Sequence, residues 1–147
     1  MDASELFNIC TELAAAPPGD KATRRLHEVV VLCAAEGCRQ QGGAFGNLFS
    51  QIDFLGKHLH LSATLVRDIQ TARRHTNTGT AIDTADWPYD LAAVTRFVAA
   101  VFHCDVPGTL LRLLPAEPGA ALLVCRRLRI QRRRRYVLRG SHRGLCF

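Results

Sequence analysis

The chain of 147 residues is long enough to bury one hydrophobic core, and its 48% hydrophobic and 22% charged content is typical of a globular protein. The net charge of +6 is unevenly distributed, because residues 1–118 carry ten basic and thirteen acidic side chains, whereas residues 119–147 carry nine arginines and no acid. Overall basicity therefore does not indicate that the main body binds polyanions. We expect a domain at 1–118 followed by an Arg-rich tail at 119–147.

The start of the chain and its apolar runs argue against secretion and membrane insertion. The segment MDASELFNICTEL has acids where a secretory signal needs basic residues, and no apolar run approaches the roughly 20 residues of a membrane span. Six cysteines without a secretory signal predict free and mostly buried thiols in a reducing compartment. We therefore expect a cytoplasmic protein without membrane contacts.

Two amphipathic helices are predicted at the start of the chain. Asp2 and Glu5 are spaced as a reciprocal capping box, and apolar residues then recur every three or four positions up to Leu13. The segment APPGD stops this helix, because proline lacks an amide proton and glycine permits a turn. Asp20 is a suitable cap for the second helix, whose pattern predicts an end near Gly37.

Two further helices follow the loop RQQGGAFG. The third has an apolar stripe that runs from Phe45 through Phe49 to Leu59. Ser62 is placed to cap the fourth, and the residues that we expect on its interior face are Leu65, Ile69 and Ala72. The opposite face is polar and consists of Arg67, Gln70, Arg74 and Asn77.

A fifth helix is predicted after the loop TNTGTAIDT, where Asp86 precedes a first turn that contains Pro88. Its apolar stripe ends near Phe102, DVPG stops it, and TLLRLL adds one or two turns. No segment before residue 119 shows the sustained alternation of a β-strand, and no internal repeat is present. The sequence therefore predicts an all-α fold, a single bundle of about five amphipathic helices.

No metal, cofactor or nucleophile site is indicated. Structural zinc sites combine two close ligand pairs, but Cys33 and Cys38 are separated by four residues and Cys33 belongs to an apolar stripe. The neighbours His103 and Cys104 would point about 100° apart on a helix. The segment QGGAFGN lacks the Lys-Ser/Thr ending of a phosphate-binding loop. We expect no metal and no cofactor.

Two groups of polar residues are candidate sites. The first is the polar face of the fourth helix and its continuation in RRHTN, where guanidinium groups match phosphate oxygens. The second is Arg96 and His103, which two helical turns would place on one face, with Ala99 and Ala100 between them. An Arg that neutralises a phosphate and a His that transfers a proton suffice for metal-free RNA cleavage. The ordinary interpretations are a solvated helix face and the rim of a bundle.

The stretch from about Leu48 to Phe102 resembles the core of HEPN-like helical domains, which occur in toxin, defence and nucleic-acid-processing proteins. In one branch of this family, a helix ends with a pattern similar to Arg-x-x-x-Asn-x-x-x-His. Arg73 and Asn77 match the first two positions, and Ala81 stands at the position of the histidine. The resemblance implies helical hairpins around a short polar motif.

A ribonuclease-type motif of the same family separates an Arg from a His by four to six residues, as Arg96 and His103 are separated here. The residue after the Arg is usually polar in that motif, whereas here it is Phe97. The segments ELFNICTEL, FGNLFSQIDFL and RLLPAEP are also similar to amino-terminal regions that precede helicase motors in large bacterial proteins. This second resemblance implies a helicase or nuclease component as a partner.

The Arg-rich tail has three interpretations. Its nine arginines would bind phosphates in a salt-dependent manner, without sequence preference. The segment LRIQRRRRYVLRG would alternatively fold as a short strand or an added helix. The abrupt change of composition after PAEPG also fits the out-of-frame end of a longer, GC-rich gene.

We expect a non-catalytic helical binding module, an accessory part of nucleic-acid-processing or defence machinery. Its predicted contact face consists of Arg67, Arg73, Arg74 and Asn77. One alternative is a metal-free ribonuclease that uses Arg96 and His103, and another is a structural module that forms a homodimer through the Ala-lined face of the fifth helix. The expected partners are nucleic acid or a larger helicase or nuclease component.

Overall fold

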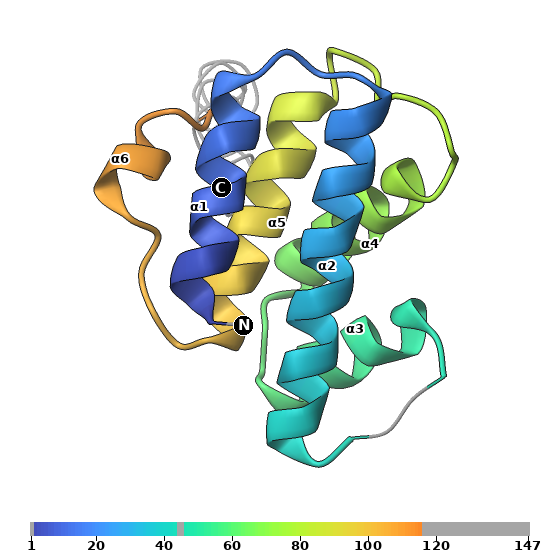
Figure 1. The fold of residues 1–147 in the computed structure, drawn as a ribbon. Helices are drawn as coiled ribbons and strands as arrows, with labels where there is room; N and C mark the ends of the chain where they lie inside the picture. Colours follow the sequence, from blue (N-terminus) through green and yellow to red (C-terminus); the bar gives the residue numbers. More distant parts are fainter. Residues whose placement is uncertain (1, 44–45, 116–147) are drawn as a thin grey trace, which may run out of the picture. The chain divides into compact units, whose positions relative to one another are not determined.

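The computed structural model describes residues 2–43 and 46–115, and this part of the chain contains six α-helices and no β-strand (Figure 1). The helices are α1 (Ala3–Ala15), α2 (Asp20–Gln41), α3 (Leu48–His58), α4 (Ala63–Thr76), α5 (Trp87–Val101) and α6 (Gly108–Leu111). The predicted all-α fold is confirmed. The Arg-rich tail at 119–147, with its three interpretations, lies outside the described residues.

Helix α5 lies at the centre of the bundle. It packs against α1, α2 and α4, while α3 packs against α2 and α4 (Figure 1). Five consecutive residues of α5, Leu91 to Thr95, are buried, which requires neighbours on every side because successive side chains point about 100° apart. None of the helices in the described ranges has the length and apolar character that crossing a membrane requires.

The starts of two helices follow the predicted signals. Glu5 N donates to Asp2 Oδ1 at 3.0 Å and Asp2 N donates to Glu5 Oε1 at 3.4 Å, which completes the capping box of α1. Ser62 Oγ accepts from Leu65 N at 3.1 Å and caps α4. Asp20, predicted as the cap of the second helix, is instead the first residue of α2.

Helix α2 is longer than predicted. It ends at Gln41 rather than near Gly37, and Gly42 follows it in the left-handed conformation with φ +77°. Gly37 is buried inside the helix, where a Cβ atom would lie 2.8 Å from Val101 Cγ1 and 2.9 Å from Leu55 Cδ1. This glycine therefore permits α3 and α5 to approach α2 closely, and it does not end the helix.

The core contains apolar side chains from all six helices. Its largest members include Leu6, Leu26, Ile52, Ile69, Phe97 and Leu110. Of the four cysteines in the described ranges, three are buried and Cys104 is exposed. Phe49 departs from the prediction, since it was expected in the interior stripe of the third helix but is 53% exposed.

Candidate functional site

The polar residues predicted on the fourth helix do not form one face. Gln70 is only 8% exposed, and its Nε2 donates to the Phe49 carbonyl oxygen at 3.2 Å. The prediction that Gln70 lies on the solvent side is therefore wrong. The physical reason is that α3 packs against this part of α4 and supplies a backbone partner for the amide.

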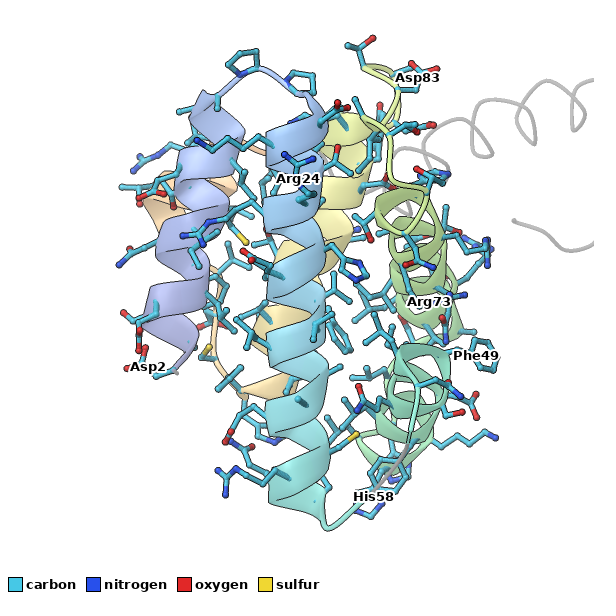
Figure 2. The ribbon with its side chains drawn as sticks, turned by 45° about the vertical axis from the view of Figure 1, so that its right-hand side comes forward. Asp2, Arg24, Phe49, His58, Arg73 and Asp83 are labelled. Atoms are coloured by element: carbon cyan, nitrogen blue, oxygen red, sulfur yellow. The ribbon has the colours of Figure 1, made fainter. Side chains whose placement is uncertain are left out.

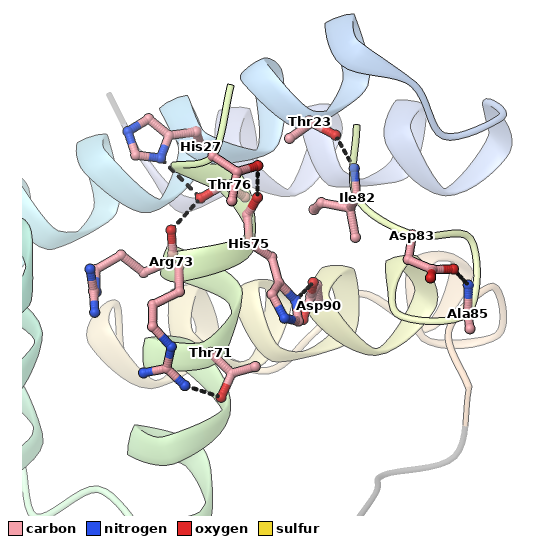
Figure 3. A network of polar contacts seen from close by, with 12 residues as sticks. Thr23, His27, Thr71, Arg73, His75, Thr76, Ile82, Asp83, Ala85 and Asp90 are labelled. Carbon is pink, nitrogen blue, oxygen red and sulfur yellow. Dashed lines mark hydrogen bonds and ion pairs between the residues drawn. The ribbon is translucent and has the colours of Figure 1, made fainter. Parts of the chain in front are cut away.

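Arg67 and Arg74 are exposed and interact with neighbours on α4. Arg67 Nε lies 3.7 Å from Asp68 Oδ1. Arg74 Nη2 donates to Thr71 Oγ1 at 3.2 Å, and Figure 3 marks this bond at Thr71. Neither arginine lines the pocket that contains Arg73. The predicted contact face is thus divided: Arg67 and Arg74 are exposed, whereas Arg73 and Asn77 line the pocket described next.

A pocket of about 310 Å³ lies where α2, the start of α3 and the end of α4 meet. It is lined by His27, Val31, Asn47, Leu48, Phe49, Arg73 and Asn77. Figure 2 shows Phe49 and Arg73 next to each other at this junction. No acidic residue is among the lining residues. We call this site the Arg73 pocket.

Arg73 is half-buried, and its charge has no compensating carboxylate within the described residues. Its Cζ lies 5.5 Å from the centroid of the Phe49 ring, a distance at which a cation is attracted to an aromatic face. Burial lowers the pKa of Arg73 from its ordinary value, and the neighbouring charge of Arg74 lowers it further. The guanidinium is therefore a partly desolvated cation without an internal counter-ion.

Gln70 holds both members of this cation–aromatic pair. Its Oε1 accepts from Arg73 Nε at 2.7 Å, while its Nε2 donates to the Phe49 carbonyl oxygen. Arg73 Nε is thus committed, and the two terminal nitrogens of the guanidinium have no hydrogen-bond partner in the described part of the chain. A buried amide that is satisfied at both ends fixes the Arg73 guanidinium relative to the backbone of Phe49.

Thr76 determines the tautomer of His27 at the side of the pocket. Its hydroxyl donates to the Arg73 carbonyl oxygen at 3.0 Å, so its oxygen accepts from His27 Nδ1, which is also 3.0 Å away (Figure 3). His27 therefore carries a proton on Nδ1, and its neutral form keeps Nε2 as an acceptor. His27 on α2, rather than Arg67 or Arg74, completes the polar lining.

The opposite side of α4 contains an interhelical contact that the sequence analysis missed. His75 Nδ1 lies 2.6 Å from Asp90 Oδ2 of α5, and Asp90 is 5% exposed (Figure 3). Burial raises the pKa of Asp90, and the hydrogen bond from His75 lowers it in part. One signal was present: Asp90 is three residues after Trp87 and four before Val94, on the buried stripe of α5.

Arg96 and His103 are not separated by two helical turns. Helix α5 ends at Val101, and His103 follows in the left-handed conformation with φ +54°, while Cys104 N donates to Ala99 O at 3.0 Å. The expectation that both side chains project on one helix face is therefore wrong. Arg96 is half-buried, with Nη2 4.0 Å from Asp68 Oδ2.

In residues 2–43 and 46–115, no three His, Cys, Asp or Glu side chains are grouped as a metal ion would need. No protein-family model, no curated protein and no solved structure matches this chain. The resemblance to HEPN-like domains stays a prediction.

Proposed function

We propose that this helical bundle is a non-catalytic binding module and that the Arg73 pocket takes a phosphate group of a nucleic acid. The observation that carries the proposal is the half-buried guanidinium of Arg73, which has no carboxylate partner among the described residues. Partial burial of an unpaired charge costs free energy, and a bound anion recovers that cost.

The chemistry of the pocket favours phosphate over other ligands. Two terminal guanidinium nitrogens match two phosphate oxygens in a bidentate arrangement, which a lysine ammonium does not provide. The lining contains no acidic side chain that would repel an anion. The first residues of α3 line the pocket, and the start of a helix carries partial positive charge.

Arg73 also lies in the last turn of α4, where basic residues stabilise a helix through its dipole. Arg74 and His75 share that turn, so a purely structural role predicts similar effects for Arg73 and Arg74. The phosphate proposal predicts that Arg73 matters for binding and Arg74 does not, because Arg74 does not line the pocket.

Filter binding of single-stranded oligonucleotides to the full chain tests the proposal. Since the tail arginines also attract phosphates, Arg132, Arg133, Arg134 and Arg135 are changed to Gln in every protein that is compared. In that background we expect Arg73→Gln to weaken binding about 10- to 100-fold, the usual effect of losing a charged hydrogen bond.

Arg25→Gln is the matched control, because Arg25 is an exposed arginine on α2 that pairs with Glu28 at 3.3 Å outside the pocket. We expect it to leave the affinity within about twofold of the parent protein, as for a screened surface charge. Equal affinities of the Arg73→Gln and Arg25→Gln proteins would contradict the proposal.

A further inference from the structure

The Arg73 pocket has an aromatic wall that phosphate binding alone does not use. Phe49 is 53% exposed and Val31 is 38% exposed, although both are large apolar residues, and both line the pocket. Exposed apolar surface that is concentrated in a concave site indicates a ligand with an apolar part. A phosphate group has no such part.

The polar groups of the pocket are arranged around this apolar surface. Asn47 Oδ1 accepts from Ser50 N at 2.8 Å, which leaves the Asn47 Nδ2 group as a donor. Asn77 has no side-chain hydrogen bond within the described residues, so its amide offers both a donor and an acceptor. Carboxamides of this kind pair with the edges of nucleobases.

Phe49 and Arg73 form a platform whose guanidinium and supporting backbone are held in place before any ligand binds. Gln70 bonds to the backbone of Phe49 and to Nε of Arg73, and it is itself 8% exposed. Phenylalanine rings and guanidinium planes are the surfaces on which unpaired bases stack. A pre-organised platform loses little conformational freedom when such a base binds.

We infer that the pocket takes one unpaired nucleotide, with its base stacked on the Phe49–Arg73 platform and its phosphate on the terminal nitrogens of Arg73. This inference rests on the proposed function, because the same guanidinium provides the phosphate contact. It adds the ligand class: a base that is already paired in a duplex cannot enter a concave site and stack there, so the ligand is single-stranded.

Two oligonucleotides of equal length and charge separate the base contribution from the phosphate contribution. One carries uracil at every position, and the other has the same sugar-phosphate backbone without bases. We expect the base-bearing strand to bind the full chain about 5- to 100-fold more tightly, as stacking contacts of single strands do. The tail meets the same backbone charge in both strands, but its arginines and Tyr136 also offer stacking surfaces. The part of the difference that depends on Phe49 is therefore the part that the pocket produces.

Phe49→Ala removes the aromatic surface, and Phe49→Trp retains it. We expect Phe49→Ala to remove most of the difference in affinity between the two strands, and Phe49→Trp to keep it. Phe49 is more than half exposed, so neither change is expected to alter the thermal melting of the helices, which circular dichroism checks in parallel.

Arg73→Gln distinguishes failure of this inference from failure of the proposed function. If Arg73→Gln weakens both strands but Phe49→Ala changes neither, the phosphate site stands and the stacked base is wrong. If Arg73→Gln weakens neither strand, both ideas are wrong. A duplex that binds as tightly as the uracil strand would also overturn the inference.

Discussion

On the side of α4 that faces α5, polar and charged side chains have partners inside the chain. His75 lies 2.6 Å from Asp90, and Arg96 lies 4.0 Å from Asp68. On the side that faces α2 and α3, Arg73 is half-buried and no carboxylate of the described residues faces it. Polarity alone therefore does not mark a site: a charge with a partner inside the chain is compensated there, and a charge left unpaired at a pocket is available to a ligand.

The largest change in stability is expected at the contact between His75 of α4 and Asp90 of α5. His75→Ala leaves the buried Asp90 carboxylate without its partner, and we expect the free energy of unfolding to fall by about 2–3 kcal/mol. This figure is below that of a fully buried pair because the His75 side chain is 35% exposed. Urea unfolding of the full chain measures the change.

His75→Asn is the matched variant, since its amide offers an N–H donor near the position of Nδ1. We expect it to recover about half of the lost free energy, as a neutral hydrogen bond to a carboxylate does. An unchanged unfolding free energy in His75→Ala would show that His75 does not compensate the buried Asp90 carboxylate.

A second experiment gives Arg73 a carboxylate partner inside the chain, like the partners found on the side of α4 that faces α5. Gln70→Glu places a carboxylate at the Arg73 guanidinium, and we expect oligonucleotide affinity to fall about tenfold or more as the charge is neutralised. Thr71→Glu is the control, because it adds the same charge to α4 beside Arg74 and away from the pocket. If both variants lost the same affinity, the cause would be long-range repulsion of the oligonucleotide and not neutralisation of Arg73.

The backbone conformation of His103, just after α5, gives this residue a structural effect that can be measured separately from any catalytic role. His103 and His60 both follow a helix with positive φ, 54° and 55°, where glycine is favoured. We expect His103→Gly and His60→Gly each to raise the free energy of unfolding by about 1 kcal/mol, measured in urea.

The ribonuclease alternative makes a different prediction for the same position. A metal-free ribonuclease would cleave RNA in the presence of EDTA and would lose this activity in His103→Ala. A non-catalytic binding module would show no RNA cleavage that depends on His103. A fluorogenic RNA assay at equal protein concentrations distinguishes the two. His60→Ala is its control, because that residue has the same backbone conformation outside the proposed motif.

The smallest expected effect concerns pH. Because burial raises the pKa of Asp90, the folded protein binds this proton more tightly than the unfolded chain does. The resulting stabilisation is fully present below the ordinary pKa of 3.8 and is lost as the pH rises through the folded value. We therefore expect Asp90→Asn to gain stability relative to the parent protein as the pH rises above 3.8. A difference that stays constant as the pH rises would contradict this assignment.

Local signals predicted much of the fold, because they are read from neighbouring residues. The capping box of Asp2 and Glu5 and the cap at Ser62 depend on spacings of three residues. The end of α2 was not predictable in this way. Glycine often ends a helix, but Gly37 lies inside α2 because Val101, far along the chain, packs where its Cβ would be.

The candidate site was predicted only in part, and for the same reason. The spacing of Arg73 and Asn77 identified two residues that do line one pocket. Sequence alone did not indicate that Gln70 is buried or that Phe49 is exposed, because both facts arise from the packing of α3 on α4. His27 comes from another helix, and no local pattern connects it to Arg73.

The proposed phosphate site depends on the Arg73 guanidinium, which has no carboxylate partner among the described residues. The most direct measurement follows the side-chain Nε–Hε resonance of Arg73 by nuclear magnetic resonance while the full chain is titrated with a uracil pentanucleotide. We predict a saturable shift of Arg73 and of the Asn77 side-chain amide, with Arg25 unchanged. Saturation of the tail arginines while Arg73 and Asn77 stay unshifted would contradict the account.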